Sequence, residues 1–373
     1  MLTIALKTTP GRGDHDVANR PQEDRMQGYR SQIRKAVLVF TFGMLLVSES
    51  SRPLTAQSAQ GHPKSDVQQV LDRALDDELH AIAFYEAVIA RFGKRRPFTN
   101  IVSAEQRHAD ALLQQYARLG LEPPKDRWQA QPVAVPDTFA EACDAAEISE
   151  ILNAALYDEI ITKVSDAEVR AVFEQLRAAS QERHLRAFRR HSNGWRAVTP
   201  DNLSEKQESQ RTMAERAWDE VFKRLMARLS TELAAGGPAG AIGVCKEVAP
   251  EIAKDVGQHR SVRIGRTSWK LRNPTNVGPP WTRLLLHDKP ETPRLAAARD
   301  GRLGVTLPIR VATTCLKCHG PVESIDPGVR EQLRANYPAD QAIGFRDGDL
   351  RGWFWVEVPE PKPGDMDANG KPE

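Results

Sequence analysis

The sequence of 373 residues has few cysteines, no excess of charge of either sign and no long hydrophobic run. Four cysteines in a chain of this length are too few for a disulfide scaffold. The 52 basic and 50 acidic side chains leave a net charge of +2, so no overall field attracts nucleic acid or an anionic membrane surface. We therefore expect no nucleic-acid partner.

The longest apolar run near the start covers residues 36–47 and follows a basic stretch. It is shorter than the roughly 20 residues that a membrane-spanning helix needs. This layout, with small residues around Ala56, is typical of a secretory signal that is cleaved after Ala56. We therefore assign residues 1–60 to a signal region and expect a periplasmic protein without a membrane span after cleavage. A short uncut anchor and a start of translation at Met26 stay open as alternatives.

Residues 64–192 predict a helical domain with an internal duplication. The segments DDELHAIAFYEAVI and EISEILNAALYDEI align so that Glu78 matches Glu150 and Tyr85 matches Tyr157. A second pair of segments follows in the same order, so the domain is a helix pair that occurs twice. The sequence thus predicts four helices.

The second pair of repeated segments, EQRHADAL and QERHLRAF, sets His108 against His184. Glu105 and His108 lie three residues apart, so a helix places them on one face. A carboxylate bundle that holds two metal ions takes one Glu from each of two helices and a Glu-x-x-His from each of the other two. Five of the six positions are filled by suitable residues: Glu78, Glu105, His108, Glu150 and His184. The sixth is Gln181, whose neutral amide bridges two iron ions less well than a carboxylate.

This helical segment resembles the ferritin-like superfamily, in an exported bacterial branch with sEqrH on the second helix and H-x-x-A-F on the fourth. The resemblance implies an antiparallel bundle with iron or another divalent metal at its centre. Buried Glu and His side chains without a metal would need a tight hydrogen-bond network, which stays open as the alternative. Tyr85 and Tyr157 lie two turns beyond Glu78 and Glu150, so they can face this site, either as packing residues or in a redox role.

Residues 193–206 contain Asn, Gly and Pro and predict a linker. Residues 207–359 begin with helical patterns and continue with short runs typical of strands, so this part is α+β. The polar residues 360–373 predict a disordered tail. The expected fold class is therefore a multidomain chain, an all-α bundle followed by an α+β domain.

The stretch TTCLKCHG contains the C-x-x-C-H spacing that attaches haem covalently. Cys315 and Cys318 would form thioethers with the two vinyl groups, and His319 would bind the iron. A zinc half-site and a redox dithiol are the alternatives, but the sequence has no second C-x-x-C, and export leads to the compartment where this haem is attached. We expect one haem c.

Further motifs follow a fixed order: AIGVCKEVAPEIA, VRIGRTSWKLRNPTN, CLKCHG and YPADQAIGFRDGDLRGWFWVEV. Together they resemble the PAS-like single-haem c-type family of soluble cytochromes and sensor domains. The resemblance implies a PAS-like antiparallel sheet over the haem, with Cys245 as the ligand opposite the histidine. Cys245 can instead be a small buried apolar residue. The other residues considered for this ligand are Met213, Met226, His259 and His287.

The basic residues of RTSWKLRN would bind the haem propionates, unless they lie on a solvated strand edge: Arg266, Lys270 and Arg272. The combination favours a protein that passes or stores single electrons, joined to a bundle that handles iron or oxygen species. Its partner would be a redox protein or a small redox-active molecule. A haem-based redox or gas sensor and a scaffold with a vestigial bundle are the alternatives. The sequence leaves an oxidoreductase activity and a homodimer open.

Overall fold

The computed structural model describes residues 66–361. Mixed helices and one small antiparallel sheet make up this part of the chain. The expected signal region lies outside the described residues, as does the expected tail except for its first two residues. Within residues 66–361, every helix is too short or too polar to cross a membrane.

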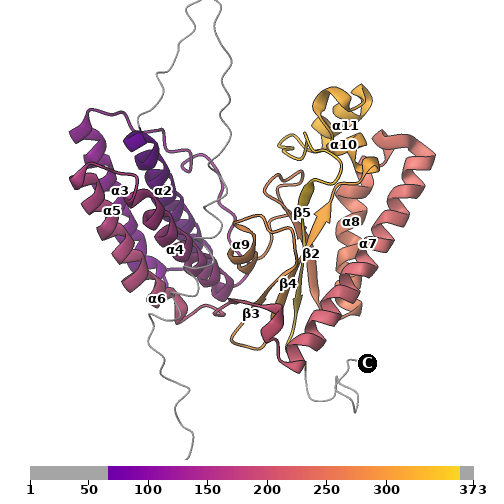
Figure 1. Ribbon diagram of the computed structural model, residues 1–373, viewed down its shortest axis with the longest axis horizontal. Helices are drawn as coiled ribbons and strands as arrows, with labels where there is room; N and C mark the ends of the chain where they lie inside the picture. The colour runs from indigo at the N-terminus through magenta and orange to yellow at the C-terminus, as the bar shows by residue number, and fades with distance from the viewer. Residues whose placement is uncertain (1–65, 362–373) are drawn as a thin grey trace, which may run out of the picture. The chain divides into compact units, whose positions relative to one another are not determined.

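Four long helices form the first half of the described chain (Figure 1). They are α2 (Asp66–Phe92), α3 (Phe98–Leu119), α4 (Phe139–Ile161) and α5 (Ala167–Ala179), the last of which continues through the π-helical turn η1 (Ser180–His184) into α6 (Leu185–Arg189). Helix α2 packs on α3, and α4 packs on α5 and α6. Further contacts of α2 with α4 and of α3 with α5 close the group, which we call the helical bundle. The two helix pairs expected from the duplication are present.

The ends of the bundle helices follow from local chemistry. Helix α4 begins with a capping box, in which the Thr138 hydroxyl accepts from the backbone N–H of Glu141 and the Glu141 carboxylate accepts from that of Thr138. Helix α3 ends at Gly120, whose φ of 64° suits glycine and terminates the helix. Apolar side chains of all four helices then enclose the polar centre described below.

The second half, which we call the sheet region, contains five antiparallel strands in the order β1-β3-β4-β5-β2. The strands are β1 (Arg196–Val198), β2 (Arg263–Thr267), β3 (Arg294–Ala297), β4 (Leu303–Arg310) and β5 (Leu350–Val358). Strand β1 lies within the segment expected to be a linker and pairs with β3 at the edge of the sheet. The division of the chain at residues 193–206 stays a prediction.

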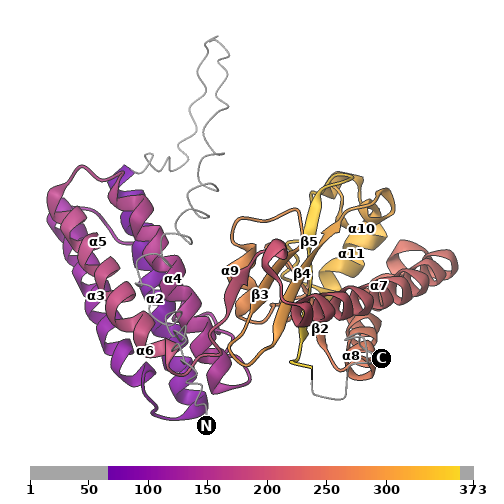
Figure 2. The same ribbon diagram turned by 60° about the horizontal axis from the view of Figure 1, so that its bottom comes forward.

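Helices cover both faces of the sheet (Figures 1 and 2). On one face lie α7 (Glu205–Gly240) and α8 (Ala249–His259), joined by the π-helical turn η3 (Val244–Val248), and on the other lies α9 (Trp281–Leu286). Alternate residues of β5 serve the two faces: Phe354 and Val356 pack in the core under α7 and α8, whereas Trp353 and Trp355 point the other way. The remaining short elements are η2 (Pro200–Asn202), η4 (Thr313–Cys315), α10 (Leu316–His319), η5 (Val322–Ser324) and α11 (Pro327–Asn336).

Candidate functional site

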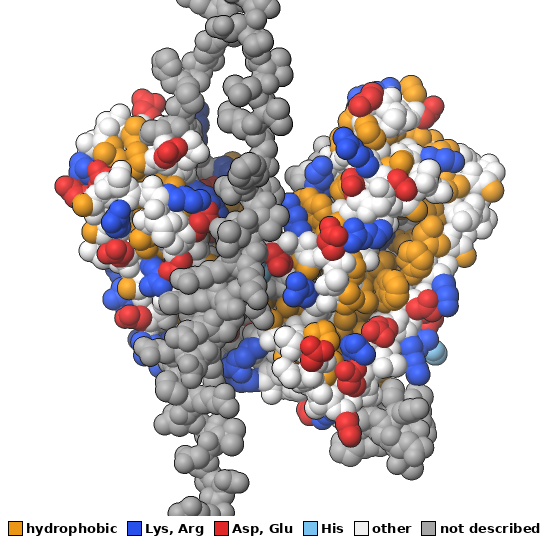
Figure 3. Space-filling model, in the orientation of Figure 1, with side chains coloured by type: hydrophobic (Ala, Val, Ile, Leu, Met, Phe, Trp, Pro, Cys, Tyr) orange, Lys and Arg blue, Asp and Glu red, His pale blue; other side chains and the backbone are white. Residues whose placement is uncertain are grey.

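A cavity of about 240 Å³ lies between α7 and the sheet. One of its walls is an apolar face of α7 with residues three and four positions apart: Phe222, Leu225, Met226, Leu229 and Leu233. Phe222 is 41% exposed, and Figure 3 shows hydrophobic side chains gathered along α7. Exposed apolar side chains that meet at a cavity favour a large apolar ligand.

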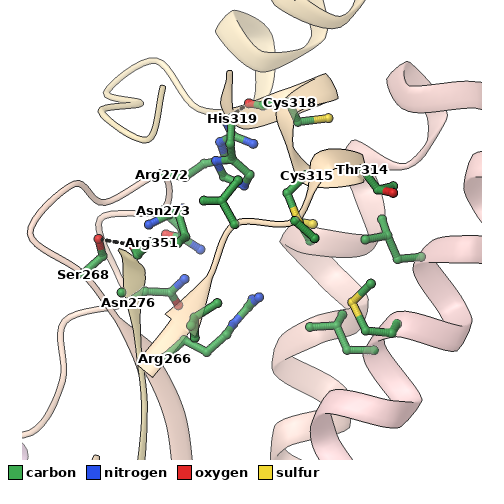
Figure 4. A pocket seen from close by; sticks show the side chains of 18 of the residues that line it. Arg266, Ser268, Arg272, Asn273, Asn276, Thr314, Cys315, Cys318, His319 and Arg351 are labelled. Atoms are coloured by element: carbon green, nitrogen blue, oxygen red, sulfur yellow. Dashed lines mark hydrogen bonds between the residues drawn. The ribbon is translucent and has the colours of Figure 1, made fainter. Parts of the chain in front are cut away.

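Cys315, Cys318 and His319 line the same cavity from η4 and α10 (Figure 4). Both cysteines are free thiols and half-buried, and burial raises the pKa of Cys318. A single helical turn therefore presents two sulfur atoms and an imidazole to one apolar space.

His319 has the form that a metal ligand requires. Its Nδ1 lies 2.7 Å from the carbonyl oxygen of Ala342. Because a carbonyl only accepts, Nδ1 carries the proton and Nε2 keeps its lone pair. Burial, together with the positive charges of Arg272 and Arg351, holds the pKa of His319 well below its usual range. A neutral imidazole fixed through Nδ1 is the usual arrangement of an iron-binding histidine, so the residues present fit a haem.

Two of the residues considered for the opposite ligand line the cavity, Cys245 and Met226. Cys245 is half-buried on η3, and single π-helical turns occur often at functional sites. Met213 packs against the core of the sheet region instead. His259 and His287 lie at the ends of α8 and α9 and are not among the cavity residues.

The predicted basic residues take different positions. Arg266 lines the cavity. Arg272 lines it as well, but its guanidinium is engaged by Asp340 at 3.0 Å and by the carbonyl oxygen of Cys318 at 2.5 Å. Lys270 lies outside the lining, and its ammonium group donates to the carbonyl oxygen of Ile343. Arg272 thus supports the loop that holds the C-x-x-C-H motif.

Arg351 was missed by the sequence analysis and lines the cavity beside Arg266 (Figure 4). Its Nη1 donates to the carbonyl oxygen of Lys270 at 3.1 Å, whereas its buried Nε has no hydrogen-bond partner among the described residues. Burial and the charges of Arg272 and Arg266 lower the pKa of Arg351 to about 10. A ligand carboxylate would relieve both the unsatisfied N–H and the repulsion. The signal in the sequence was the arginine that begins RGWFWVEV.

A second cluster occupies the centre of the helical bundle, where ligand atoms of Glu105, His108 and His184 lie within 4.8 Å of one another. Glu105 is central, because its two oxygens lie 2.7 Å from Nδ1 of His108 and 3.0 Å from Nδ1 of His184. Glu78 lies 3.4 Å from the His108 nitrogen, and Glu150 lies 3.5 Å from that of His184. The structure therefore brings together all five predicted residues, which we call the bundle site.

Tyr85 and Tyr157 also belong to the bundle site, and each donates a hydrogen bond to a carboxylate of the other repeat. The hydroxyl of Tyr157 donates to Glu78 at 2.6 Å, and that of Tyr85 donates to Glu150 at 2.9 Å. Both tyrosines are fully buried. Each half of the duplication thus supplies a carboxylate to its own histidine and a hydroxyl to the carboxylate of the other half.

The electrostatics of the bundle site are those of a compact ionic network. Burial opposes the charge on Glu105, but His108 and His184 outweigh it and hold the pKa at about 2. Burial likewise opposes protonation of the histidines, and the carboxylates nevertheless raise the pKa of His108 to about 9 and that of His184 to about 10. Burial and the charge of Glu105 raise the pKa of Glu78 to about 8. Glu105 and the two histidines thus favour their charged forms, whereas the raised pKa of Glu78 favours its neutral carboxyl.

The bundle site also fits a metal. The Nδ1 atoms of His108 and His184 are buried and close to carboxylates, yet neither has a partner with hydrogen-bond geometry in residues 66–361. Nitrogen atoms directed at carboxylate oxygens without a shared hydrogen bond match the donor set of an iron or zinc site. Gln181 is half-buried on η1, whereas His184, three residues later, is 4% exposed.

Comparison with known proteins gives one family and two solved structures. The family model described as Tll0287-like matches residues 159–359, from the end of α4 to the end of β5. The structure of the cyanobacterial heme-protein Tll0287 is 22% identical, with 45% of this chain and 100% of that chain covered and a TM-score of 0.32. Hypothetical protein MJ0754 from Methanococcus jannaschii is also 22% identical, with 42% and 93% covered and a TM-score of 0.32. No curated protein matches the chain.

Proposed function

The chain belongs to the Tll0287-like family, and from that premise we propose that its sheet region binds one haem covalently and serves in electron transfer. The observation that carries the proposal is the meeting of Cys315, Cys318 and a neutral His319 at one apolar cavity. The two sulfurs would form the thioethers, and Nε2 of His319 would bind the iron. When bound, haem supplies a one-electron couple.

The other cavity residues would fix the haem and its surroundings. The apolar face of α7 would cover the ring and exclude water, which favours a stable electron carrier. Arg266 and Arg351 would bind the propionates, because Arg272 is already paired with Asp340. We assign Cys245 as the ligand opposite His319, since its half-buried thiol lines the cavity on a π-helical turn. The resemblance to PAS-like haem domains agrees with the antiparallel sheet behind the cavity.

For the helical bundle we propose a ferritin-like metal site formed by the five residues of the bundle site. The two buried His nitrogens without hydrogen-bond partners support it. The whole chain would then be an exported, periplasmic protein that combines electron transfer with the redox handling of iron or oxygen species. Its partner would be a redox protein or a small redox-active molecule.

The test is the absorption spectrum of the protein purified from a host that attaches haem c, in both redox states, with iron measured per chain. We expect haem that resists extraction by acid-acetone, and a shifted pyridine haemochrome band after Cys315→Ser or Cys318→Ser. Cys143→Ala, at a buried cysteine of the helical bundle, is the control and should leave the band unchanged. Haem extractable from the unmodified protein would contradict the proposal. One iron per chain indicates haem alone, and two or three indicate metal in the bundle site.

The ligand opposite His319 is tested by comparing Cys245→Ala with Met226→Leu. Both positions line the cavity, and leucine keeps the apolar wall of α7. We expect the ferric spectrum to change with Cys245→Ala and to stay the same with Met226→Leu. If Cys245→Ala leaves the ferric spectrum as it is, Cys245 is not the ligand. If only Met226→Leu changes the ferric spectrum, the sulfur of Met226 is the iron ligand instead of Cys245.

A further inference from the structure

Five of the seven tryptophans of the chain lie in one row through the sheet region. In order from the edge of the sheet to the cavity, this tryptophan row consists of Trp195, Trp281, Trp355, Trp353 and Trp269. The proposed function uses none of them. The other two tryptophans, Trp128 and Trp218, are half-buried elsewhere.

The tryptophan row has a ring pair in near contact at each of its two ends. The ring centroids of Trp195 and Trp281 are 5.2 Å apart and stacked, and Trp355 packs against the cluster that contains both. Trp353 and Trp355 share one face of β5, two residues apart, which sets their Cα atoms about 7 Å apart. Trp269 follows at 5.3 Å from Trp353.

The row ends beside the proposed iron ligand. The ring of Phe345 lies 6.3 Å from that of Trp269 and 6.3 Å from that of His319. The opposite end, Trp195, immediately precedes β1 at the edge of the sheet. The tryptophan row therefore leads from the proximal side of the haem site to the far edge of the sheet.

Two strand glycines make room for the row. A Cβ atom at Gly265 of β2 would lie 2.5 Å from the ring of Trp355, and one at Gly304 of β4 would lie 2.8 Å from the ring of Trp281. Glycine weakens a strand interior, so its presence there marks a close approach by another group. Glycine at these two positions lowers the stability of β2 and β4, but it lets the indoles of Trp355 and Trp281 lie directly against the sheet.

Three of the five indoles are buried away from water, and one of these has a proton acceptor. Trp281 and Trp353 are 1% exposed and Trp195 is 5% exposed. The indole N–H of Trp281 donates to the buried carboxylate of Glu357 at 3.0 Å, whereas that of Trp353 donates to the carbonyl oxygen of Pro290. Of these two indoles, only Trp281 can hand its proton to a base.

We propose that the tryptophan row removes oxidising equivalents from the haem site by sending electrons from its indoles toward His319. The inference rests on the proposed function, because it needs a haem at the Phe345 end of the row. Indole is among the side chains that lose an electron most readily, and neighbours in near contact pass the electron in short steps. The row would thereby protect the cavity from damage and move the oxidation to residues distant from the haem.

The oxidant is hydrogen peroxide reacting in the cavity. Its O–O bond breaks as it takes two electrons and two protons and leaves as two waters. Two indoles each lose one electron, and the peroxide takes its two protons from solvent. Trp281 passes its N–H proton to Glu357 and becomes the resting place of one neutral radical, while a half-buried indole of the row releases its proton to solvent. One peroxide, two tryptophans, one solvent proton and the Glu357 carboxylate thus give two waters, two neutral tryptophan radicals and a protonated Glu357.

The experiment treats the ferric haem-loaded protein with hydrogen peroxide in the absence of an added donor. Freeze-quenched samples are examined by electron paramagnetic resonance, and oxidised tryptophans are located by mass spectrometry. We expect a tryptophan radical, and oxidation concentrated on the tryptophan row. Trp128 and Trp218 serve as internal controls, because they are half-buried like Trp269 and Trp355 but lie outside the row. Oxidation of these two to the same extent as the row would overturn the inference.

Variants at Trp353 test the connection itself. Phenylalanine keeps an aromatic ring but is hard to oxidise, so Trp353→Phe should reduce oxidation of Trp281 and Trp195 to the level of Trp128. Trp353→Tyr should restore it, because a phenol can lose an electron. Trp269→Phe interrupts the row at the end next to Phe345. Because Trp269 is half-buried, this variant can replace Trp353→Phe if Trp353→Phe does not fold. Unchanged oxidation of Trp281 in both phenylalanine variants would contradict the inference, while a chain without attached haem would contradict the proposed function instead.

Discussion

In the helical bundle the ionisable side chains face one another, whereas in the sheet region the arginines, thiols and apolar side chains of the cavity face an open space. Glu105 contacts both histidines, and each tyrosine caps a carboxylate. In the cavity, by contrast, the charges of Arg272 and Arg266 repel that of Arg351, and Phe222 is 41% exposed. The bundle site therefore contains charges of both signs, which can balance one another, whereas the cavity leaves like charges and apolar surface that a ligand would compensate.

The helical bundle and the sheet region nevertheless share one structural feature, a π-helical turn at a proposed ligand. His184 lies on the π-helical turn η1, and Cys245 lies on the π-helical turn η3. A π-helical turn inserts one residue into a helix and so turns the following side chains to a new direction. In both regions it occurs at a proposed ligand, which indicates that each helix departs from regular geometry where a metal atom would be bound.

The largest effect is expected from removing the haem attachment with Cys315→Ser and Cys318→Ser together. If haem covers about 200 Å² of apolar wall, its loss would lower the free energy of unfolding of the sheet region by about 5 kcal/mol at 25 cal/mol per Å². Thermal unfolding of the variant and the parent protein measures this loss. Removal of bundle metal with a chelator, in contrast, should leave helix unfolding nearly unchanged. Equal stability of the double variant and the parent protein would remove the contrast between the two regions.

The next effect concerns Glu105, the carboxylate that contacts both histidines of the bundle site. In Glu105→Gln the histidines keep a buried positive charge without its central partner, and breaking a buried ion pair in this way costs about 4 kcal/mol. Denaturant unfolding of metal-free protein, followed by helix content, checks the value. Glu86→Gln, an exposed position on α2, is the matched control and should change little. A metal-free Glu105→Gln protein as stable as the control would mean that the network does not hold the bundle together.

A smaller and paired effect is expected from Tyr85→Phe and Tyr157→Phe. Each variant removes one hydrogen bond to a buried carboxylate, worth about 2 kcal/mol. Because the duplication places the two hydroxyls in equivalent positions, both variants should lose similar stability in denaturant unfolding. Tyr116→Phe, which removes a bond to the half-exposed Asp72, should lose less. Strongly unequal losses would show that the two halves of the bundle site are not equivalent.

Gln181→Glu should have the smallest effect on stability. It should instead change the metal occupancy of the bundle site. A carboxylate at this position would supply the sixth ligand of a two-metal bundle, so metal occupancy should rise. Metal analysis of both proteins after loading with ferrous iron under anaerobic conditions measures the change. Glu182→Gln, at the exposed neighbouring position, controls for a simple change of charge. Unchanged occupancy, together with a metal-free native protein, would favour a bundle held only by its own network.

Much of the bundle site could be predicted because it depends on local spacing and on a duplication that is visible in the sequence. Glu105 and His108 share a helix face whatever the tertiary structure is, and the alignment of the repeats supplied Glu150, His184 and both tyrosines. The π-helical turn at His184 could not be foreseen, because it changes hydrogen bonding over a single turn and leaves no pattern of its own.

The cavity was predicted less completely. The C-x-x-C-H motif fixes three residues by spacing, but the choice between Lys270 and Arg351 depends on how a loop after β2 lies against the start of β5. Strand β1 was hidden for a similar reason: its three residues acquire strand geometry only by pairing with β3, about a hundred residues later. The WFWV run shows that two indoles share a face of β5, but not that Trp195, Trp269 and Trp281 join them.

The pairing of β1 with β3 decides where the gene can be cut. A fragment that begins at residue 207 would lack Arg196–Val198 and would leave the N–H and C=O groups of β3 without their partners. An unpaired edge of this kind recruits strands of other molecules, so such a fragment should aggregate. It would also lose Trp195, which stacks on Trp281. Recombination or engineering that transfers the sheet region to another protein must therefore carry the residues between the last bundle helix and α7 with it.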